Sequence, residues 1–247
     1  EGYGLTECAP LVSCNPLNDT RRAGSIGIPF PSTDIRVVDP ETLQDVPLGE
    51  EGELWVHGPQ CFAGYWKREE DTQKTITADG WLRTGDIGSL DEDGYLRITG
   101  RRKELIITAG GKNVAPAILE DRLRGHPLVS QVVVVGDNQP FISALITLDA
   151  DMLPQWLKNH GLEEMSVEQA AKNPEVLAAL DRAVERTNEA VSRAESIRSF
   201  RVLTDDFTEA NGLLTPSLKV KRAAALAKYA DVVDSIYASK ASSMPTD

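Results

Sequence analysis

The first seven residues of the chain gather side chains of the kinds that bind a nucleotide. Gly2-Tyr3-Gly4-Leu5-Thr6-Glu7 brings an aromatic ring, a hydroxyl and a carboxylate together on one glycine-containing stretch. An aromatic ring can stack on a base, a hydroxyl can donate to a phosphate, and carboxylate oxygens can hold a hard cation. The pattern is short, and an ordinary turn with an exposed glutamate would have the same residues.

A second group of polar residues surrounds a tight glycine turn. Asp86 follows Arg83-Thr84-Gly85, and the basic run Arg101-Arg102-Lys103 comes shortly after it. A carboxylate that is at least partly buried can accept two hydrogen bonds from a ribose diol, and such charge-assisted bonds are strong. A simple turn aspartate is the competing interpretation, because Gly85 directly precedes it.

Two further segments combine flexible backbone with positive charge. Gly110 and Gly111 lack Cβ atoms, so the backbone there can approach a narrow ligand closely, although a plain turn would look the same. Residues 211–222 read NGLLTPSLKVKR and carry Lys219 and Lys221. A solvated start of a basic helix is the competing interpretation of this segment.

In this order along the chain, the motifs resemble those of the acyl-adenylate-forming superfamily, which includes acyl-CoA synthetases, luciferases and peptide-synthetase adenylation domains. Residues 81–113 resemble the crossover between the two domains of these enzymes. Gly52-Glu53-Leu54 and Gly64-Tyr65-Trp66 also stand where the family has them. The resemblance spans residues 1 to about 240.

The resemblance implies roles for the residues of the first two groups. Tyr3 would lie against adenine, Thr6 would contact the phosphates, and Glu7 would coordinate Mg²⁺. Asp86 would bind the ribose, and Arg101 would add a cation near ribose and phosphate.

It also implies roles for residues of the mobile domain. Lys103 stands at the position of the domain hinge, where a few residues absorb a large backbone rotation. Gly110 and Gly111 would line the passage for the pantetheine arm of coenzyme A.

The segment at residues 211–222 would supply a catalytic lysine. In the family, this lysine bridges the substrate carboxylate and the α-phosphate, where a compact ammonium stabilises the negative charge of the transition state. Lys219 takes the role by its place in the motif. The commoner family form has Gly where this chain has Leu218, so the choice of Lys219 over Lys221 stays open.

The expected function is therefore that of a long-chain fatty acid–CoA ligase that uses ATP, Mg²⁺ and coenzyme A. The NGLLTP form at residues 211–216 and the helical insertion before it resemble the enzymes for long acyl chains. The family's phosphate loop and acyl pocket lie upstream of the residues 2–7 motif, so we expect this piece to be inactive alone. Three alternatives remain: a fatty acyl-AMP ligase that delivers to a carrier protein, a luciferase-like oxygenating enzyme, and a non-catalytic interaction module.

The elements that must position the first group of residues are expected to be strands. Short β-branched or aromatic runs bounded by Pro, Gly and Asp occur at residues 34–39, 52–57, 82–90 and 95–99. Asp91-Glu92-Asp93-Gly94 joins the last two as a tight hairpin loop. We therefore predict a small antiparallel, barrel-like subdomain over residues 1–100, the end of a larger domain.

From Arg101 onward, strand and helix patterns mix, which predicts a mobile α+β domain over residues 101–240 and a mixed α/β fold class overall. A helix is expected from Pro116 to the Gly125-His126-Pro127 stop, followed by paired central strands at residues 131–136 and 142–148.

Residues 151–195 are expected to be helical and acidic. Ser166 and Gln169 form a capping-box pattern, and a stripe at helical spacing predicts core packing. The stripe consists of Val176, Leu180, Val184, Thr187 and Val191. A last, basic helix is expected at residues 217–228, and the tail at residues 241–247 is expected to be disordered.

Composition limits which partners, compartments and cysteine roles are possible. The net charge is −12 over 247 residues, which argues against nucleic acid as a partner, because phosphate backbones require a basic face. No apolar run approaches the roughly 18–20 residues that cross a bilayer, so a cytoplasmic enzyme is expected, with peripheral membrane association and oligomeric state left open. Cys8, Cys14 and Cys61 match no CxxC pattern and predict thiols in a reducing compartment.

Overall fold

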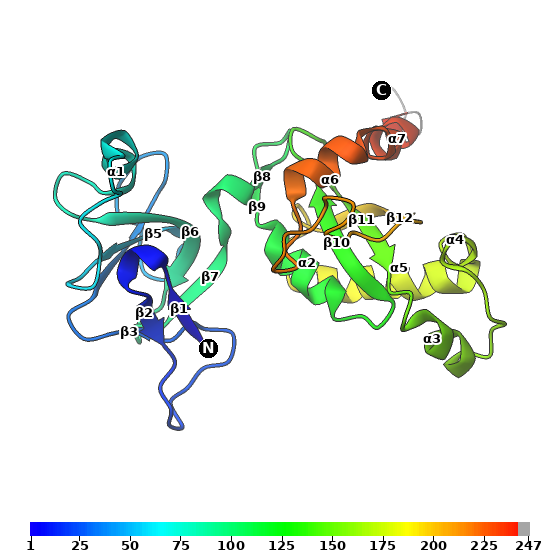
Figure 1. Ribbon diagram of the computed structural model, residues 1–247, viewed down its shortest axis with the longest axis horizontal. Coiled ribbons are helices and arrows are strands. Elements are labelled where there is room, and N and C mark those ends of the chain that lie inside the picture. The colour runs from blue at the N-terminus through cyan, green and yellow to red at the C-terminus, as the bar shows by residue number, and fades with distance from the viewer. Residues whose placement is uncertain (242–247) are drawn as a thin grey trace. The chain divides into compact units, whose positions relative to one another are not determined.

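The computed structural model describes the backbone of residues 1–241 and the side chains of residues 1–238 (Figure 1). The chain forms two compact units, Glu1–Glu104 and a second that begins at Leu105. The two units meet between Glu104 and Leu105, and the sequence analysis placed the boundary near residue 101. Each unit mixes strands with helices, which confirms the mixed α/β fold class. Of the tail predicted to be disordered at residues 241–247, Ala241 instead ends the last helix, and residues 242–247 lie outside the described residues.

A four-stranded antiparallel sheet forms the larger part of the first unit. Its order is β4-β5-β6-β7, and its strands are β4 (Asp34–Val38), β5 (Gly52–His57), β6 (Leu82–Leu90) and β7 (Leu96–Arg101). The four strands predicted from the sequence are therefore confirmed. Leu54, Leu82 and Leu96 are almost fully buried and hold the sheet to its surroundings.

The hairpin between β6 and β7 forms at the predicted loop. Gly94 has a φ of +83°, a conformation that glycine adopts without a steric penalty. The Asp91 carboxylate accepts hydrogen bonds from the backbone N–H groups of Asp93 (3.0 Å) and Tyr95 (2.8 Å). The loop sets the register next to it, and a shift between Ile87 and Gly88 then pairs Asp86 of β6 with Arg101 of β7.

A smaller antiparallel sheet at the N-terminus of the chain was not predicted. It joins β1 (Gly2–Gly4), β2 (Leu11–Cys14) and β3 (Ile28–Pro29). A short 3₁₀ turn, η1 (Thr6–Cys8), follows β1. Gly4 is required there, because a Cβ atom would lie 2.1 Å from the carbonyl oxygen of Pro10. Helix α1 (Glu69–Thr75) and the 3₁₀ turn η2 (Arg102–Glu104) complete the unit.

The second unit contains a three-stranded sheet of order β10-β11-β12. The strands are β10 (Val129–Val135), β11 (Ile142–Leu148) and β12 (Ile197–Leu203). β10 and β11 pair with each other, as predicted, and are antiparallel, whereas β12 lies parallel to β11. Only β11 is central, because β12 covers its other side, so the prediction of a central strand at residues 131–136 is wrong. Successive side chains of β10 alternate between two cores: Val132 and Val134 join one, and their neighbours Val133 and Val135 join the other.

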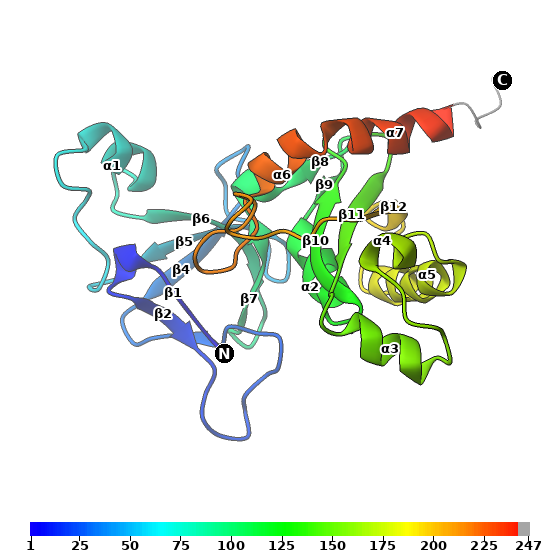
Figure 2. The same cartoon turned by 45° about the vertical axis from the view of Figure 1, so that its right-hand side comes forward.

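Helices cover both faces of this sheet (Figure 2). α2 (Pro116–Arg124), α3 (Leu153–Asn159) and α5 (Pro174–Asn188) contribute to the first core. α6 (Arg222–Lys228) and α7 (Ala230–Ala241) lie on the other face. The chain from α3 through α4 (Val167–Ala170) and α5 supplies the crossover that a parallel β11–β12 pair requires.

The helices agree with the sequence in detail, with one correction. The predicted capping box is present at Ser166 and Gln169, and the predicted stripe lies on the core-facing side of α5, with Val191 packing just beyond its end. The basic helix expected from Ser217 begins instead at Arg222. Leu218 has a φ of +60°, which no helix accommodates, and residues 215–219 form a turn.

Within the described residues, no helix has both the length and the apolar character needed to cross a membrane.

Candidate nucleotide-binding site

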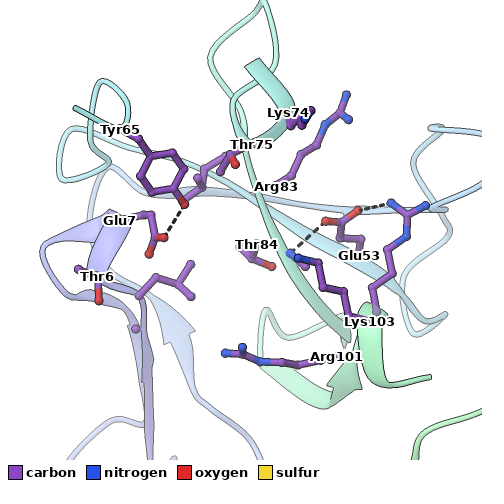
Figure 3. A pocket seen from close by; sticks show the side chains of 15 residues that line it. Thr6, Glu7, Glu53, Tyr65, Lys74, Thr75, Arg83, Thr84, Arg101 and Lys103 are labelled. Atoms are coloured by element: carbon purple, nitrogen blue, oxygen red, sulfur yellow. Dashed lines mark hydrogen bonds and ion pairs between the residues drawn. The ribbon is translucent and has the colours of Figure 1, made fainter. Parts of the chain in front are cut away.

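A cavity of about 650 Å³ opens on the first unit (Figure 3). Five parts of the chain converge on it: the β1–η1 turn, strand β5, the segment from Tyr65 through α1, strand β6, and the β7–η2 turn. The residues that line it are Gly4, Leu5, Thr6, Glu7, Glu53, Tyr65, Lys74, Thr75, Leu82, Arg83, Thr84, Gly85, Arg101, Arg102 and Lys103. Thr6, Glu7, Arg101 and Lys103 were singled out from the sequence, and the fold brings them to one place.

Glu7 is held at one side of the cavity by Tyr65. The Tyr65 hydroxyl donates a hydrogen bond to Oε1 of Glu7 (2.7 Å), and Figure 3 shows the two side chains pointing at each other. This hydrogen bond, with partial burial, raises the pKa of Tyr65, so the hydroxyl remains a donor. The Glu7 carbonyl accepts from the Phe62 N–H (2.8 Å). Glu7 is therefore fixed through both its side chain and its backbone.

The glycine turn before Asp86 lines the cavity between its two sides. Gly85 has a φ of +72°, and its N–H donates to Oε1 of Glu53 (3.0 Å). The Thr84 hydroxyl donates to the Leu54 carbonyl (2.7 Å) and accepts from the Asp86 N–H (3.0 Å). These hydrogen bonds fix the position on β6 from which the Asp86 side chain extends.

Glu53 is a site residue that the sequence analysis did not identify as one. It is 3% exposed, and its carboxylate binds both the Gly85 N–H and the Arg102 guanidinium (3.4 Å). A charged residue in the middle of the apolar strand at residues 52–57 was the signal that could have identified it, because buried charges are nearly always paired.

Asp86 lies behind the cavity wall and has a partner on each carboxylate oxygen. It is 3% exposed, accepts a hydrogen bond from the Tyr3 hydroxyl (2.5 Å), and lies 3.1 Å from Nε of Arg101. Burial, reinforced by the Asp86 carboxylate, raises the pKa of Tyr3 well above its ordinary value, so Tyr3 stays a hydrogen-bond donor. Tyr3 and Asp86 are not themselves lining residues, whereas their neighbours Gly4 and Gly85 are.

The cavity carries a surplus of positive charge. Its cationic lining residues are Lys74, Arg83, Arg101, Arg102 and Lys103, and its carboxylates are Glu7 and Glu53. One of the guanidiniums is engaged by Glu53 and another by Asp86. The remaining cations are the groups that bind phosphate oxygens in proteins. The arrangement therefore suits a polyanionic ligand.

A metal at Glu7 would need ligands from the substrate. Among the described residues, His, Cys, Asp and Glu side chains form no group of three or more that could hold a metal ion. Mg²⁺ commonly uses one or two carboxylates together with substrate phosphates and water. Glu7, beside the cations of the cavity, fits that pattern.

The other predicted site residues belong to the second unit. Gly110 and Gly111 lie in the turn between β8 (Ile106–Ile107) and β9 (Asn113–Val114), and Gly111 has a φ of +77° with open space where a Cβ atom would be. Lys219 lies in an exposed turn, in which the Thr215 N–H donates to the Lys219 carbonyl (2.8 Å).

An ion pair anchors the chain directly after that turn. Nη2 of Arg222 lies 2.6 Å from Oε1 of Glu120, and Nη1 of Arg222 donates to the Val134 carbonyl (2.8 Å). The same Glu120 oxygen accepts from the Val134 N–H (2.7 Å). These contacts attach the start of α6 to α2 and to the free edge of β10. The segment that carries Lys219 and Lys221 is thereby anchored at its C-terminal end.

Comparison with known proteins gives consistent family matches in both units. Residues 1–66 match the AMP-binding enzyme family, and residues 103–241 match the AMP-binding enzyme C-terminal domain. The long-chain-fatty-acid–CoA ligase FadD15 of Mycobacterium tuberculosis is 49% identical over 238 residues, which are 96% of this chain and 38% of the relative. A long-chain-fatty-acid–CoA ligase of Yersinia pestis is 44% identical over 165 residues, 65% of this chain and 29% of the relative.

Solved structures of the same fold include two informative cases. The adenylation domain of a carboxylate reductase from Mycobacterium chelonae aligns with a TM-score of 0.72 at 27% identity, covering 96% of this chain and 34% of the other. O-succinylbenzoate coenzyme A synthetase of Bacillus subtilis, in complex with ATP and magnesium ion, aligns with a TM-score of 0.65 at 27% identity, covering 90% and 40%. The chain thus spans well under half the length of these proteins. With both units matched in order, it belongs to the AMP-binding enzyme family.

Proposed function

We propose that this chain is part of a long-chain fatty acid–CoA ligase, which joins a fatty acid to coenzyme A through an acyl-adenylate. The observation that carries the proposal is the cationic cavity with Thr6 and Glu7 on one side and Arg101 and Lys103 on the other, where Arg101 also pairs with the Asp86 carboxylate behind the cavity wall. The names of the relatives support the long-chain substrate. Action in the cytoplasm, with or without peripheral membrane contact, remains a prediction.

In the proposed first step, the fatty acid carboxylate attacks the α-phosphate of ATP and pyrophosphate leaves. Asp86 holds the ribose, with Tyr3 near the adenine, and Thr6 contacts the phosphates. Glu7 would hold Mg²⁺, which offsets phosphate charge when bound. Lys219 stabilises the charge that develops between the carboxylate and the α-phosphate.

In the proposed second step, the coenzyme A thiol attacks the carbonyl carbon of the acyl-adenylate and AMP leaves. Rotation of the second unit about Lys103 would remove the Lys219 turn from the active site and bring the Gly110–Gly111 turn there in its place. Because Gly111 has open space in place of a side chain, the turn can approach a slender pantetheine arm closely. The two steps then depend on different residues of the second unit.

The test uses the complete ligase that contains this chain. Pyrophosphate release is measured with carboxylates of increasing length, with and without coenzyme A, and thioester and acyl-AMP are quantified separately. We expect release to be greatest with long chains and the thioester to form with free coenzyme A. Acyl-AMP that persists beside free coenzyme A would instead identify a carrier-protein ligase. Release that is greatest with short carboxylates would overturn the substrate assignment. The isolated chain should release no pyrophosphate.

The role of Lys219 is tested by separating the half-reactions in the same enzyme. We expect Lys219→Ala to reduce acyl-AMP formation by about 10²-fold or more, because a charge-stabilising group worth several kcal/mol is lost. It should leave thioester formation from supplied acyl-AMP within about twofold of the parent. Lys221→Ala is the matched control, two positions away in an exposed part of the same segment. If Lys221→Ala, and not Lys219→Ala, blocked the first step, the assignment would pass to Lys221.

A further inference from the structure

Two cysteines that lie far apart in the sequence meet beside the candidate site. Cys8 ends the η1 turn, and Cys61 follows β5. Their Sγ atoms are 3.0 Å apart, and one thiol donates a hydrogen bond to the other sulfur. Cys8 is fully buried, whereas Cys61 is partly exposed. Both residues belong to the first unit, so the contact lies within one compact body.

Backbone hydrogen bonds hold both cysteines in place. The Cys8 N–H donates to the Leu5 carbonyl (2.9 Å), and the Cys61 N–H donates to the Gly58 carbonyl (3.1 Å). The residues adjacent to the pair are also joined, because the Phe62 N–H donates to the Glu7 carbonyl (2.8 Å). The two sulfurs are therefore fixed toward each other by the fold.

We propose that Cys8 and Cys61 are a thiol–disulfide modification site that a peroxide closes and a dithiol reopens. A disulfide bond is about 2.05 Å long, so the sulfurs must approach by only about 1 Å. In a reducing compartment such a bond would be transient, as redox-sensing disulfides are.

The chemistry begins at the more accessible sulfur. The Cys61 thiolate attacks one oxygen of hydrogen peroxide, the O–O bond breaks, and Cys61 becomes a sulfenic acid while hydroxide leaves and takes up a proton to become water. The Cys8 sulfur then attacks the Cys61 sulfur, and the sulfenic hydroxyl leaves as a second water with the Cys8 proton. Two thiols lose two electrons in total, and one peroxide is reduced to two waters.

The environment of Cys8 explains why Cys61 reacts first and Cys8 second. Burial, and then the hydrogen bond with Cys61, raise the pKa of Cys8 well above its ordinary value. Cys8 therefore keeps its proton and does not react with a peroxide in solution, and it acts only on a partner sulfur already beside it. A buried thiol without such a neighbour would be inert.

The experiment uses the 247-residue chain carrying Cys14→Ser, so that Cys8 and Cys61 are the two remaining cysteines. The chain is treated with stoichiometric hydrogen peroxide, blocked with a thiol alkylating reagent, and digested with trypsin without reduction. Tryptic cleavage places Cys8 in residues 1–21 and Cys61 in residues 37–67. We expect these two peptides to appear as one cross-linked species that lacks two hydrogens. Dithiothreitol should return both free peptides.

Two controls and one physical measurement complete the test. Cys8→Ser with Cys14→Ser should stop at the Cys61 sulfenic or sulfinic acid, and Cys61→Ser with Cys14→Ser should resist the peroxide. The oxidised Cys14→Ser chain should unfold at a higher temperature than its reduced form, because a cross-link between distant residues restricts the unfolded chain. Two free thiols persisting after the treatment, or Cys61 overoxidised with Cys8 still free, would overturn the proposal.

Discussion

Asp86 has every one of its strong interactions made within the first unit. Tyr3 donates to one carboxylate oxygen and Arg101 lies against the other. Each carboxylate oxygen can accept a second hydrogen bond, so a ribose diol that binds Asp86 would share these oxygens with Tyr3 and Arg101. The Tyr3 hydroxyl therefore competes with the nucleotide for one of the two oxygens.

Two substitutions distinguish the carboxylate from its partner. In the complete ligase, we expect Asp86→Asn to weaken Mg·ATP binding by about tenfold or more, since hydrogen bonds to a charged group are worth about 1.5–3 kcal/mol. Tyr3→Phe keeps the ring and removes the competing donor, so binding should be unchanged or tighter. Titration calorimetry with Mg·ATP measures both. Equal losses in the two variants would mean that the Tyr3 hydroxyl itself contacts the nucleotide.

For individual residues, the sequence indicated which residue types belong to the site but not their hydrogen-bond and ion-pair partners. Glu7, Asp86 and Arg101 were predicted as site residues from short motifs, and the first unit places them at or directly behind one cavity. The Tyr3–Asp86 bond joins residues 83 positions apart, and the Tyr65–Glu7 bond joins residues 58 apart. Contacts over such separations depend on strand pairing across the whole unit, which local patterns do not specify.

Among the elements, the Lys219 turn departs most from its expected form. Leu218 stands where glycine is commoner, yet it adopts the left-handed conformation that glycine would adopt, with a φ of +60°. Its side chain is 68% exposed, so packing does not compensate for the strain. In this chain a leucine therefore adopts a backbone conformation that glycine adopts more readily.

We expect Leu218→Gly to leave the free energy of unfolding within about 0.5 kcal/mol of the parent. Relief of about 1 kcal/mol of backbone strain is offset by the greater freedom of glycine in the unfolded chain. Leu218→Val should destabilise the chain by about 1 kcal/mol, because a β-branched residue fits this conformation poorly. Urea unfolding of the 247-residue chain measures both. A larger loss for glycine than for valine would show that the Leu218 side chain stabilises the turn.

The start of α6 gives a second prediction among the elements. Glu120 is 8% exposed and satisfies both the Arg222 guanidinium and the Val134 N–H. We expect Glu120→Ala to cost about 3 kcal/mol, the lower end for breaking a buried pair, because the Arg222 side chain is 23% exposed. Glu120→Gln keeps an acceptor for Val134 and should cost less.

Chemical denaturation checks this prediction, with Glu168→Ala as the control for losing an exposed glutamate. If Glu120→Ala were no more damaging than Glu168→Ala, the ion pair would not hold the start of α6 in solution.

Elements with strong local signals were predictable, and those that depend on distant partners were not. The hairpin after β6 carries its own turn residues, and α5 carries a capped, periodic pattern. Strand β12 lacks such a signal, because it forms by pairing with β11 across a helical crossover. The first residue of α6 is set by the Leu218 conformation and the Glu120–Arg222 pair, neither of which is visible in helical periodicity.

For the molecule as a whole, one histidine links stability to pH. Burial, and then the nearby Arg186 and Arg182, lower the pKa of His126, whose Nδ1 accepts the Leu128 N–H (3.3 Å). The unfolded state therefore binds a proton more readily than the folded state. As pH falls through the ordinary histidine value of about 6.5, stability is lost.

The prediction compares free energies of unfolding at about pH 8 and about pH 5. His126→Gln should lose less stability over this interval than the parent chain, because it lacks the group that titrates differently in the two states. His57→Gln, at a histidine whose side chain is 53% exposed, is the matched control. Equal acid sensitivity of the parent and the His126→Gln chain would contradict the argument.

Side chains occupy backbone groups at both margins of the three-stranded sheet in the second unit. Glu120 and Arg222 bind the N–H and carbonyl of Val134 at the β10 margin, and the Asn188 amide binds the N–H (2.8 Å) and carbonyl (3.0 Å) of Ile197 at the β12 margin. Side chains that bind the backbone groups of edge strands disfavour pairing with a strand from another molecule. Val134 and Ile197 therefore offer neither their N–H nor their carbonyl to a further strand. In the proposed two-step chemistry, in which the second unit would turn between the half-reactions, these contacts within the unit would keep both positions occupied while it moves.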